Sequence, residues 1–274
     1  MSEIDSCAYL LVSHGSSDPR HQIAINQLTQ LVEQRILFSQ QNNFQTLVGA
    51  ASLEFAPLPL NQSICQFAKQ AQVRGYQEVK IVPLFLLPGV HVVEDIPAAV
   101  ALAQQELDKQ IQLTIQPYLG SYSRIIKLLE SQFTSLTSRI LISHGSRRPG
   151  SNQIIENIAS NLNALAAYWS VKPTLAAQVA TLVEQGSQQI AIVPYFLFSG
   201  GITDGIAEQI QQLQYQFPEV KLLLGKPLGV STQLADLIVD LQIGGNCLNR
   251  TSRDTLFADN TTRSGEGEVK AFGI

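Results

Sequence analysis

The chain repeats itself, and this internal repeat restricts the possible folds more than any other feature of the sequence. Residues 10–16 (LLVSHGS) return as residues 141–146 (LISHGS), and residues 81–86 (IVPLFL) return as residues 192–197 (IVPYFL). Repetition of this kind indicates the duplication of a structural unit. We predict two similar domains and a tail, with boundaries at residues 1–136, 137–243 and 244–274.

Each half is predicted to have an α/β fold. Uninterrupted apolar runs are typical of parallel strands covered on both faces, and the chain has such runs at residues 8–12, 79–87, 140–142 and 190–198. Further strands are predicted at residues 47–53, 113–116 and 222–224. We therefore expect each half to form a four-stranded parallel sheet flanked by helices.

Helices are expected between the strands of the first half. Apolar side chains recur every three or four residues over 25–36 and 60–71, which is typical of helices with one buried face. A third helix is expected to begin at Asp95, whose side chain would cap it, with Pro97 in its first turn. The polar tail, with few apolar residues, is expected to be disordered.

The two halves differ in length and in their polar residues. The segment between the repeated His-Gly and Val-Pro motifs is shorter in the second half, which predicts a shorter first helix and loop there. Residues 89–91 (GVH) correspond to residues 200–202 (GGI), and the second half has no acid in the segment that corresponds to Glu54. We expect the first half to carry the chemistry and His144 to be a structural turn residue.

The composition excludes several classes of protein. The net charge is -4, the sequence pI is about 5.6 and there is no run of Lys or Arg, so nucleic acid is not an expected partner. The apolar stretch over 81–93 is interrupted by prolines and is shorter than the roughly 20 residues that cross a membrane. The acidic N-terminus does not resemble a secretory signal, and three scattered cysteines suggest neither a disulfide framework nor a zinc site. We expect a cytoplasmic protein.

Polar side chains follow three of the expected strands of the first half. His14 comes directly after the first strand, Glu54 ends the second strand segment, and His91 follows the third strand by a few residues. Ligands of parallel α/β sheets bind at the edge where the strands have their carboxyl ends. Neutral imidazole together with carboxylate suits divalent iron, cobalt, nickel or zinc, and histidine also accepts protons near neutral pH. These residues predict a metal site with proton-transfer capacity.

The landmarks of the first half resemble those of a known family. Residues 12–16 (VSHGS), 52–54 (SLE) and 82–91 (VPLFLLPGVH), the last leading to 95–97 (DIP), are similar to the sirohydrochlorin chelatases, the class II tetrapyrrole chelatases. The long form of that family has two halves, and the resemblance spans about residues 7 to 242. It implies two chelatase-like domains and ATP-independent insertion of cobalt or ferrous iron into sirohydrochlorin, for cobalamin or siroheme. It also implies a site at His14, Glu54 and His91.

In this hypothesis the metal ion is a substrate, and we expect no tightly bound cofactor. His14 and His91 would bind the incoming metal and take up pyrrole protons, while Glu54 would orient an imidazole or relay a proton. The macrocycle would contact apolar loop residues, and its carboxylates would need cationic or polar partners. The candidates for these contacts are Ser16, Arg20, Leu87, Pro88, Val90, Arg147 and Arg148.

Other interpretations of the same residues remain open at this point. A single histidine at a strand end is more often structural than a ligand. A non-catalytic protein that binds or delivers metal would use the same two histidines. Histidine phosphatases also place His-Gly after a strand, but they have Arg before that histidine, where this chain has Ser13. Neither the choice of metal nor the oligomeric state follows from the sequence, although a monomer is favoured because fused halves can satisfy their interface within one chain.

Overall fold

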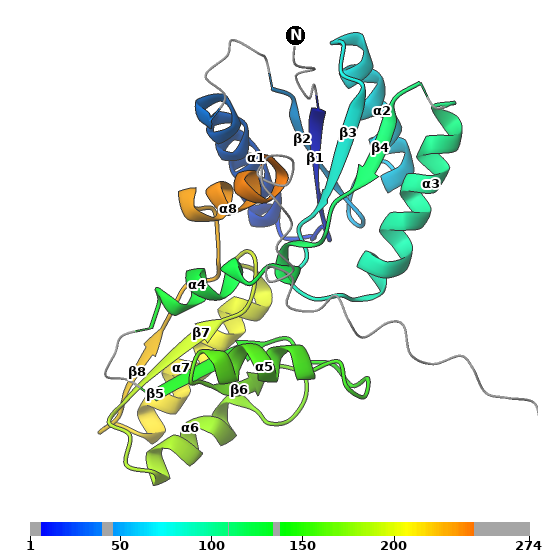
Figure 1. Ribbon diagram of the computed structural model, residues 1–274. Coiled ribbons are helices and arrows are strands. Elements are labelled where there is room, and N and C mark those ends of the chain that lie inside the picture. Colours follow the sequence, from blue (N-terminus) through cyan, green and yellow to red (C-terminus); the bar gives the residue numbers. More distant parts are fainter. Residues whose placement is uncertain (1–6, 40–45, 109, 134–137, 244–274) are drawn as a thin grey trace, which may run out of the picture.

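The computed structural model describes residues 7–39, 46–108, 110–133 and 138–243, so the predicted tail lies outside the described residues. Two four-stranded sheets form the centre of the structure, one from each half of the chain (Figure 1). All strand pairs in both sheets are parallel, as the uninterrupted apolar runs predict. The prediction of two four-stranded parallel sheets flanked by helices is confirmed.

The first half contains four strands in the order β2-β1-β3-β4. Its elements are β1 (Cys7–Ser13), α1 (Pro19–Ser39), β2 (Val48–Ser52), α2 (Leu60–Val73), β3 (Glu78–Pro83), the π turn η1 (His91–Asp95), α3 (Ile96–Glu106), β4 (Gln112–Ile115), the short 3-10 turn η2 (Leu119–Ser121) and α4 (Arg124–Glu130).

The second half repeats this order as β6-β5-β7-β8. Its elements are β5 (Ser138–Ser143), α5 (Gln153–Asn161), β6 (Leu165–Tyr168), α6 (Leu175–Glu184), β7 (Gln189–Pro194), α7 (Gly201–Gln216), β8 (Lys221–Leu224) and α8 (Thr232–Ile243). Helix α5 has 9 residues where α1 has 21, so the second half is shortened at its first helix, as expected.

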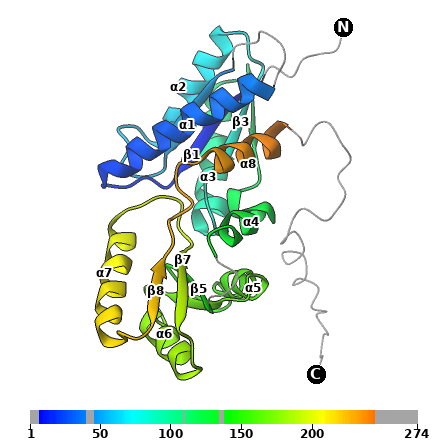
Figure 2. The ribbon, with the colours of Figure 1, turned by 90° about the vertical axis from the view of Figure 1, so that its left-hand side faces the viewer.

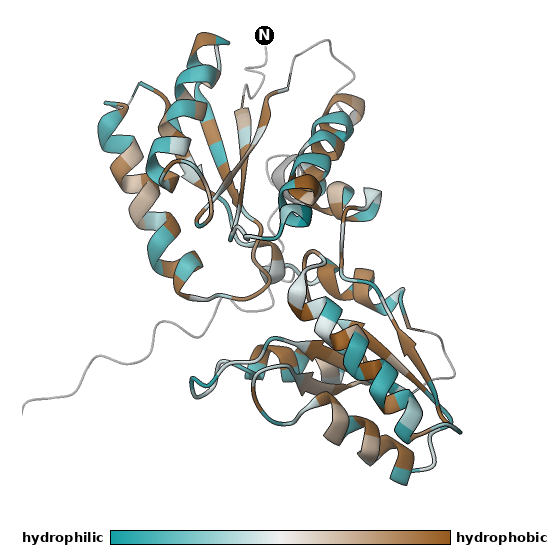
Figure 3. Ribbon diagram, turned by 180° about the vertical axis from the view of Figure 1, so that it is seen from behind, coloured by the Kyte–Doolittle hydropathy of each residue, from teal (hydrophilic) through white to brown (hydrophobic). Residues whose placement is uncertain are grey.

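The core explains why the central strands are apolar without alternation. All seven residues of β1 are buried, because α2 and α3 cover one face of the first sheet and α1 covers the other. Figure 3 shows the same pattern in both halves, with apolar strands and helices that mix apolar and hydrophilic residues. Burial on both faces of a parallel sheet therefore fixes the layer order of each half.

The last helix crosses from the second half to the first. Helix α8 packs beside α1 on the first sheet (Figure 2), and Leu234 and Ile238 of α8 are buried in one core with Ile25 and Leu28 of α1. The boundary expected near residue 136 separates the two sheets, whereas α8 belongs by packing to the first half. The sequence repeat could not reveal this crossing, since an apolar helix stripe is compatible with either sheet.

Two of the predicted strands end earlier than expected. Strands β3 and β7 end at Pro83 and Pro194 instead of continuing to residues 87 and 198. After each proline one further backbone N–H donates to the central strand, from Leu84 to the oxygen of Val12 and from Tyr195 to that of Ile142. The central strands end there, so the apolar residues that follow form loops instead of longer strands.

The expected helix start at Asp95 is also wrong. Helical structure begins at His91 with the π turn, and Asp95 has helical dihedral angles without a capping hydrogen bond. The cause is Pro97, which lacks an N–H and crowds the carbonyl four residues before it. The backbone widens ahead of the proline, so that Ile96 donates to the oxygen of His91 five residues back.

The two halves contact each other through residues that follow their strands. The Arg20 guanidinium forms ion pairs with Asp18 and, across the halves, with Asp204 of α7, each at 2.6 Å. These ion pairs raise the pKa of Arg20 and lower those of both carboxyl groups. The Tyr195 hydroxyl donates to the oxygen of Leu86 at 3.2 Å. The carboxyl edges of the two sheets therefore face each other, as Figure 1 shows.

None of the helices within the described ranges is both long enough and apolar enough to cross a lipid bilayer.

The matching strand ends of the two halves predict opposite effects of one substitution. Ser13 and Ser143 are each 1% exposed. The Ser13 hydroxyl lies 3.1 Å from that of Ser52, whereas Ser143 is opposite Tyr168 and its hydroxyl has no hydrogen-bond partner among the described residues. An unsatisfied buried polar group is costly. We expect Ser143→Ala to raise the free energy of unfolding by about 1 kcal/mol and Ser13→Ala to lower it. Urea unfolding would measure both, and a destabilising Ser143→Ala would contradict the argument.

The contact between His21 and Phe198 predicts a pH dependence. Their rings meet edge to face across the halves at 5.5 Å. Burial lowers the pKa of His21 from 6.5, and the nearby His14 lowers it further. The His21 imidazole therefore binds a proton more readily in the unfolded chain than in the folded one. The free energy of unfolding then begins to fall as the pH drops through 6.5, and its contribution from His21 is fully lost below the folded-state pKa. We expect His21→Gln to reduce the loss of stability between about pH 8 and pH 5. Equal losses in both proteins, measured as urea midpoints, would refute this role.

Candidate metal centre

Three predicted site residues come together at the carboxyl edge of the first sheet. His14, Glu54 and His91 each offer one ligand atom, and these atoms all lie within 4.8 Å of one another. They come from the loops after β1, β2 and β3, which are neighbours in the sheet. Among the described residues, no other group of three or more His, Cys, Asp or Glu side chains is placed to hold a metal ion.

Backbone contacts hold Glu54 beside His14. The Leu53 N–H donates to the oxygen of Ser13 at 3.0 Å, and the Glu54 N–H donates to that of His14 at 2.9 Å. Gly15 makes this approach possible, because it has a φ of 91° and a Cβ there would lie 2.0 Å from the Glu54 oxygen. Geometry therefore requires a glycine directly after His14, and this glycine allows Glu54 to lie beside the histidine.

The two imidazoles lie edge to face. Their ring centroids are 4.7 Å apart with an interplanar angle of 79°. Phe85 lies beside both rings, at 6.5 Å from His14 and 6.1 Å from His91. His14 and Glu54 are exposed and His91 is partly exposed, so a ligand can reach the group from solvent.

His91 has an acidic partner, Asp95, whose expected role was that of a helix cap. Its Nδ1 lies 2.6 Å from Oδ2 of Asp95, one turn further along the helical segment. With Nδ1 engaged, Nε2 is the nitrogen left to bind a metal. The i, i+4 spacing of His91 and Asp95 is the sequence signal for this contact, because residues four apart lie on the same side of a helix. The expected helix start at Asp95 concealed it, since it placed His91 outside the helix.

The arrangement suits a metal ion that is held briefly. Two ligands about 2.1 Å from one ion can be no more than about 4.2 Å apart, so small side-chain movements bring all three donors onto it. Three donors from one face leave coordination positions open for water or for another ligand. The site can also accept protons, since neutral imidazole and carboxylate are both bases.

The second half has a corresponding position without the chemistry. The Ser170 N–H donates to the oxygen of His144 at 2.9 Å, as the Glu54 N–H does to that of His14. Ser170 therefore occupies the place of the acid, and its hydroxyl also donates to the His144 oxygen. Ile202 stands where the repeat aligns His91. Only the first histidine of the set remains in this half.

The predicted substrate contacts lie in loops at the facing edges of the sheets. Leu87 and Val90 are partly exposed and Pro88 is exposed, in the loop that leads to His91. Arg147 and Arg148 are exposed after β5. The exposed Ser16 accepts a hydrogen bond from the N–H of Asp18. Arg20 differs from the others, because its guanidinium is already engaged by two carboxylates.

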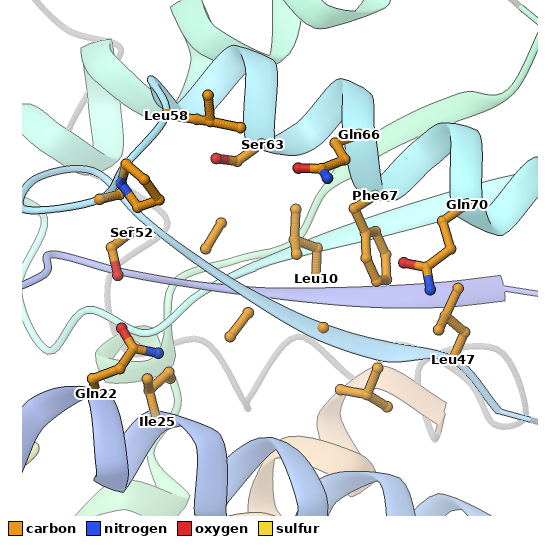
Figure 4. Close-up of a pocket in the computed structure, with 16 residues that line it drawn as sticks. Leu10, Gln22, Ile25, Leu47, Ser52, Leu58, Ser63, Gln66, Phe67 and Gln70 are labelled. Atoms are coloured by element: carbon orange, nitrogen blue, oxygen red, sulfur yellow. The ribbon is translucent and has the colours of Figure 1, made fainter.

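A separate cavity of about 450 Å³ lies beside the outer strand β2, between α1 and α2 (Figure 4). Its described lining is uncharged and includes Gln22, Ser52, Gln66, Phe67 and Gln70. None of the three clustered metal-binding candidates is part of that lining, so this cavity is not where the metal chemistry would occur.

Comparison with known proteins places the fold and the repeat in one family. Both halves match the CbiX family, over residues 8–136 and 138–242. The chain is 22% identical over 249 residues to the sirohydrochlorin cobaltochelatase of Priestia megaterium, covering 84% of this chain and 76% of that protein. It is 29% identical over 123 residues to the sirohydrochlorin ferrochelatase of the same organism, covering 42% and 46%.

Solved structures show the same fold. SirB from Bacillus subtilis with Fe3+ superposes with a TM-score of 0.68 at 20% identity, covering 86% of this chain and 94% of SirB. The cobalt complex of SirB from Bacillus subtilis subspecies spizizenii gives 0.65 at 20% identity, covering 86% and 93%. Since the family match extends through both sheets and leaves out little beyond the two ends, the chain belongs to the CbiX family.

Proposed function

We propose that the protein inserts a divalent metal ion, cobalt or ferrous iron, into sirohydrochlorin without ATP, at His14, Glu54 and His91. The observation that carries this proposal is the convergence of two imidazoles and a carboxylate at an accessible sheet edge, with donor atoms within 4.8 Å. Relatives named as sirohydrochlorin cobaltochelatase and ferrochelatase support it. The metal is a substrate that enters and leaves with each turnover.

The reaction requires a site that binds metal and also removes protons. A free-base tetrapyrrole loses two pyrrole protons as the divalent ion replaces them, so the ring gains the metal and releases two H+. In our proposal His14 and His91 bind the ion through neutral nitrogens, and the ring nitrogens displace them. Each released imidazole, together with the Glu54 carboxylate, can then accept a proton from the pyrrole.

Weak, open coordination fits such a transfer. A closed site with four ligands would hold the ion too tightly to release it, whereas three donors on one face leave room for the ring nitrogens to approach. The apolar loop residues Leu87, Pro88 and Val90 are proposed to contact the macrocycle. The exposed guanidinium groups of Arg147 and Arg148, from the other half, are proposed to bind its carboxylates.

The second half is proposed to be a scaffold. It has Ser170 and Ile202 in place of the acid and the second histidine, so it lacks a complete donor set at its own edge. Its contribution to the chemistry would consist of the loops that it presents to the first half.

Metallation can be tested directly. We expect the purified protein to accelerate the change in visible absorption of sirohydrochlorin when Co2+ or Fe2+ is added, compared with the same mixture without protein. A protein that only binds or delivers metal would bind the ion without accelerating this change. Parallel reactions with both ions would also show which of them is preferred.

The two histidines of the repeat predict a matched pair of variants. His91→Ala should lower kcat/KM by at least about 100-fold, because it removes a ligand and a proton acceptor. His144→Ala should stay within about twofold of the unchanged protein, since its partners in the second half are missing. His144 is exposed after β5, and His91 is partly exposed with an exposed acid as its hydrogen-bond partner, so the free energy of unfolding should change by no more than about 0.5 kcal/mol in either variant. Equal rates for His91→Ala and the unchanged protein would contradict the proposed site.

The carboxylate can be tested in the same way. Glu54→Gln keeps the size of the side chain but loses its negative charge and its basicity, so we expect the metallation rate to fall by about 100-fold. Ser170→Ala, at the corresponding position of the second half, is the control and should leave the rate unchanged. A Glu54→Gln variant as fast as the control would remove the acid from the mechanism.

A further inference from the structure

We propose that Asp95 is a positioning residue that fixes the ring of His91 so that Nε2 meets the incoming metal ion. This inference rests on the proposed function, in which His91 is a metal ligand. It concerns how one ligand is held in place, and it does not add a further ligand to the site.

The contact between the two side chains is short and specific. Oδ2 of Asp95 lies 2.6 Å from Nδ1 of His91, a distance typical of a charge-assisted hydrogen bond. A carboxylate can only accept a hydrogen bond, so Nδ1 carries the hydrogen and Nε2 has the free lone pair. The contact thereby selects one tautomer, the one that leaves the outer nitrogen available to a metal.

The position of the ring is determined from more than one side. Phe85 lies 6.1 Å from the His91 ring, and His14 meets it edge to face at 4.7 Å. Neither neighbour fixes rotation about the bond to the ring, whereas the hydrogen bond to Asp95 does. A preorganised ligand loses less conformational freedom when it binds, which favours metal binding.

The backbone that presents Asp95 is built for this contact. Asp95 is the last residue of the π turn that begins at His91. Pro97 disfavours a regular α-helix at this point. Asp95 has no capping role, and in the described structure its side chain bonds to His91.

The second half provides an internal comparison. Aligned on Gly89 and Gly200, His91 corresponds to Ile202. Helix α7 is regular from Gly201 onward, and its first buried residue, Ile206, matches the buried Ile96 that follows the π turn, so Gly205 takes the place of Asp95. Where the histidine is missing, the acid and the π turn are missing too, which indicates that they serve one purpose.

A purely structural role for the pair has little support. The His91 side chain is 31% exposed and that of Asp95 is 46% exposed, and exposed i, i+4 pairs contribute little to stability. If the contact only stabilised the helix, its removal would leave the affinity for metal unchanged. This difference makes the two roles separable by experiment.

The test measures Co2+ binding to the full-length protein without tetrapyrrole, by the visible absorption of the bound ion. We expect Asp95→Ala to raise the Kd for Co2+ by about 10- to 100-fold. Asp95→Asn keeps a hydrogen-bond acceptor without the charge and should lie between Asp95→Ala and the unchanged protein. The control is Glu94→Gln, which removes a charge from the adjacent exposed residue and should stay within about twofold.

Two outcomes separate the inference from the function on which it rests. If Asp95→Ala binds Co2+ as tightly as Glu94→Gln while His91→Ala binds weakly, the positioning role is overturned and the metal site stands. If His91→Ala also binds Co2+ like the unchanged protein, the proposed site itself fails. Thermal unfolding of each variant shows whether it has kept its fold. If Asp95→Ala has not, the Kd of Asp95→Asn for Co2+ is compared with that of Glu94→Gln, and equal values overturn the positioning role.

Discussion

The parallel pairing of β1 with both β2 and β3 is the constraint on which the rest of the structure depends. It places the carboxyl ends of three strands side by side, so that residues far apart in the sequence emerge at one edge. The pairing continues past the strand ends, where the Glu54 N–H bonds to the oxygen of His14 and Gly15 leaves room for that approach. The site is therefore a continuation of the backbone ladder, and its geometry follows from the sheet.

The duplication separates what the fold needs from what the chemistry needs. Both halves retain the ladder, the His-Gly turn and the backbone bond from the next loop to the histidine carbonyl. The side chains at the ends of these elements differ, with Ser170 in place of Glu54 and Ile202 in place of His91. The buried Ser143 hydroxyl lacks a hydrogen-bond partner among the described residues as a consequence of the same divergence, because the neighbouring strand offers Tyr168 where the first half has Ser52. A half can thus lose its donors and keep its architecture.

Sequence reasoning worked where a pattern had one physical cause. Uninterrupted apolar runs predicted parallel strands, and polar residues at strand ends predicted that His14, Glu54 and His91 would meet. It failed where two causes gave the same pattern. The apolar residues after Pro83 belong to a loop in which Leu84 is buried and Leu87 is partly exposed, and the stripe of α8 packs across the repeat against α1. Asp95 beside Pro97 suggests a helix start, and only the backbone shows that a π turn gives the acid to His91.

In the proposed function, the second half also has a part to play at this edge, although its own donor set is incomplete. A flat macrocycle at His14 and His91 would leave one face toward the opposing loops, and water there would compete for the open coordination positions of the metal. The second half presents its own strand ends toward that side, held in place by the Tyr195 bond to Leu86 and by the ion pair between Arg20 and Asp204. These contacts fix the spacing of the two edges. In the proposed function, the second half would therefore shape the space in which the first half carries out the transfer.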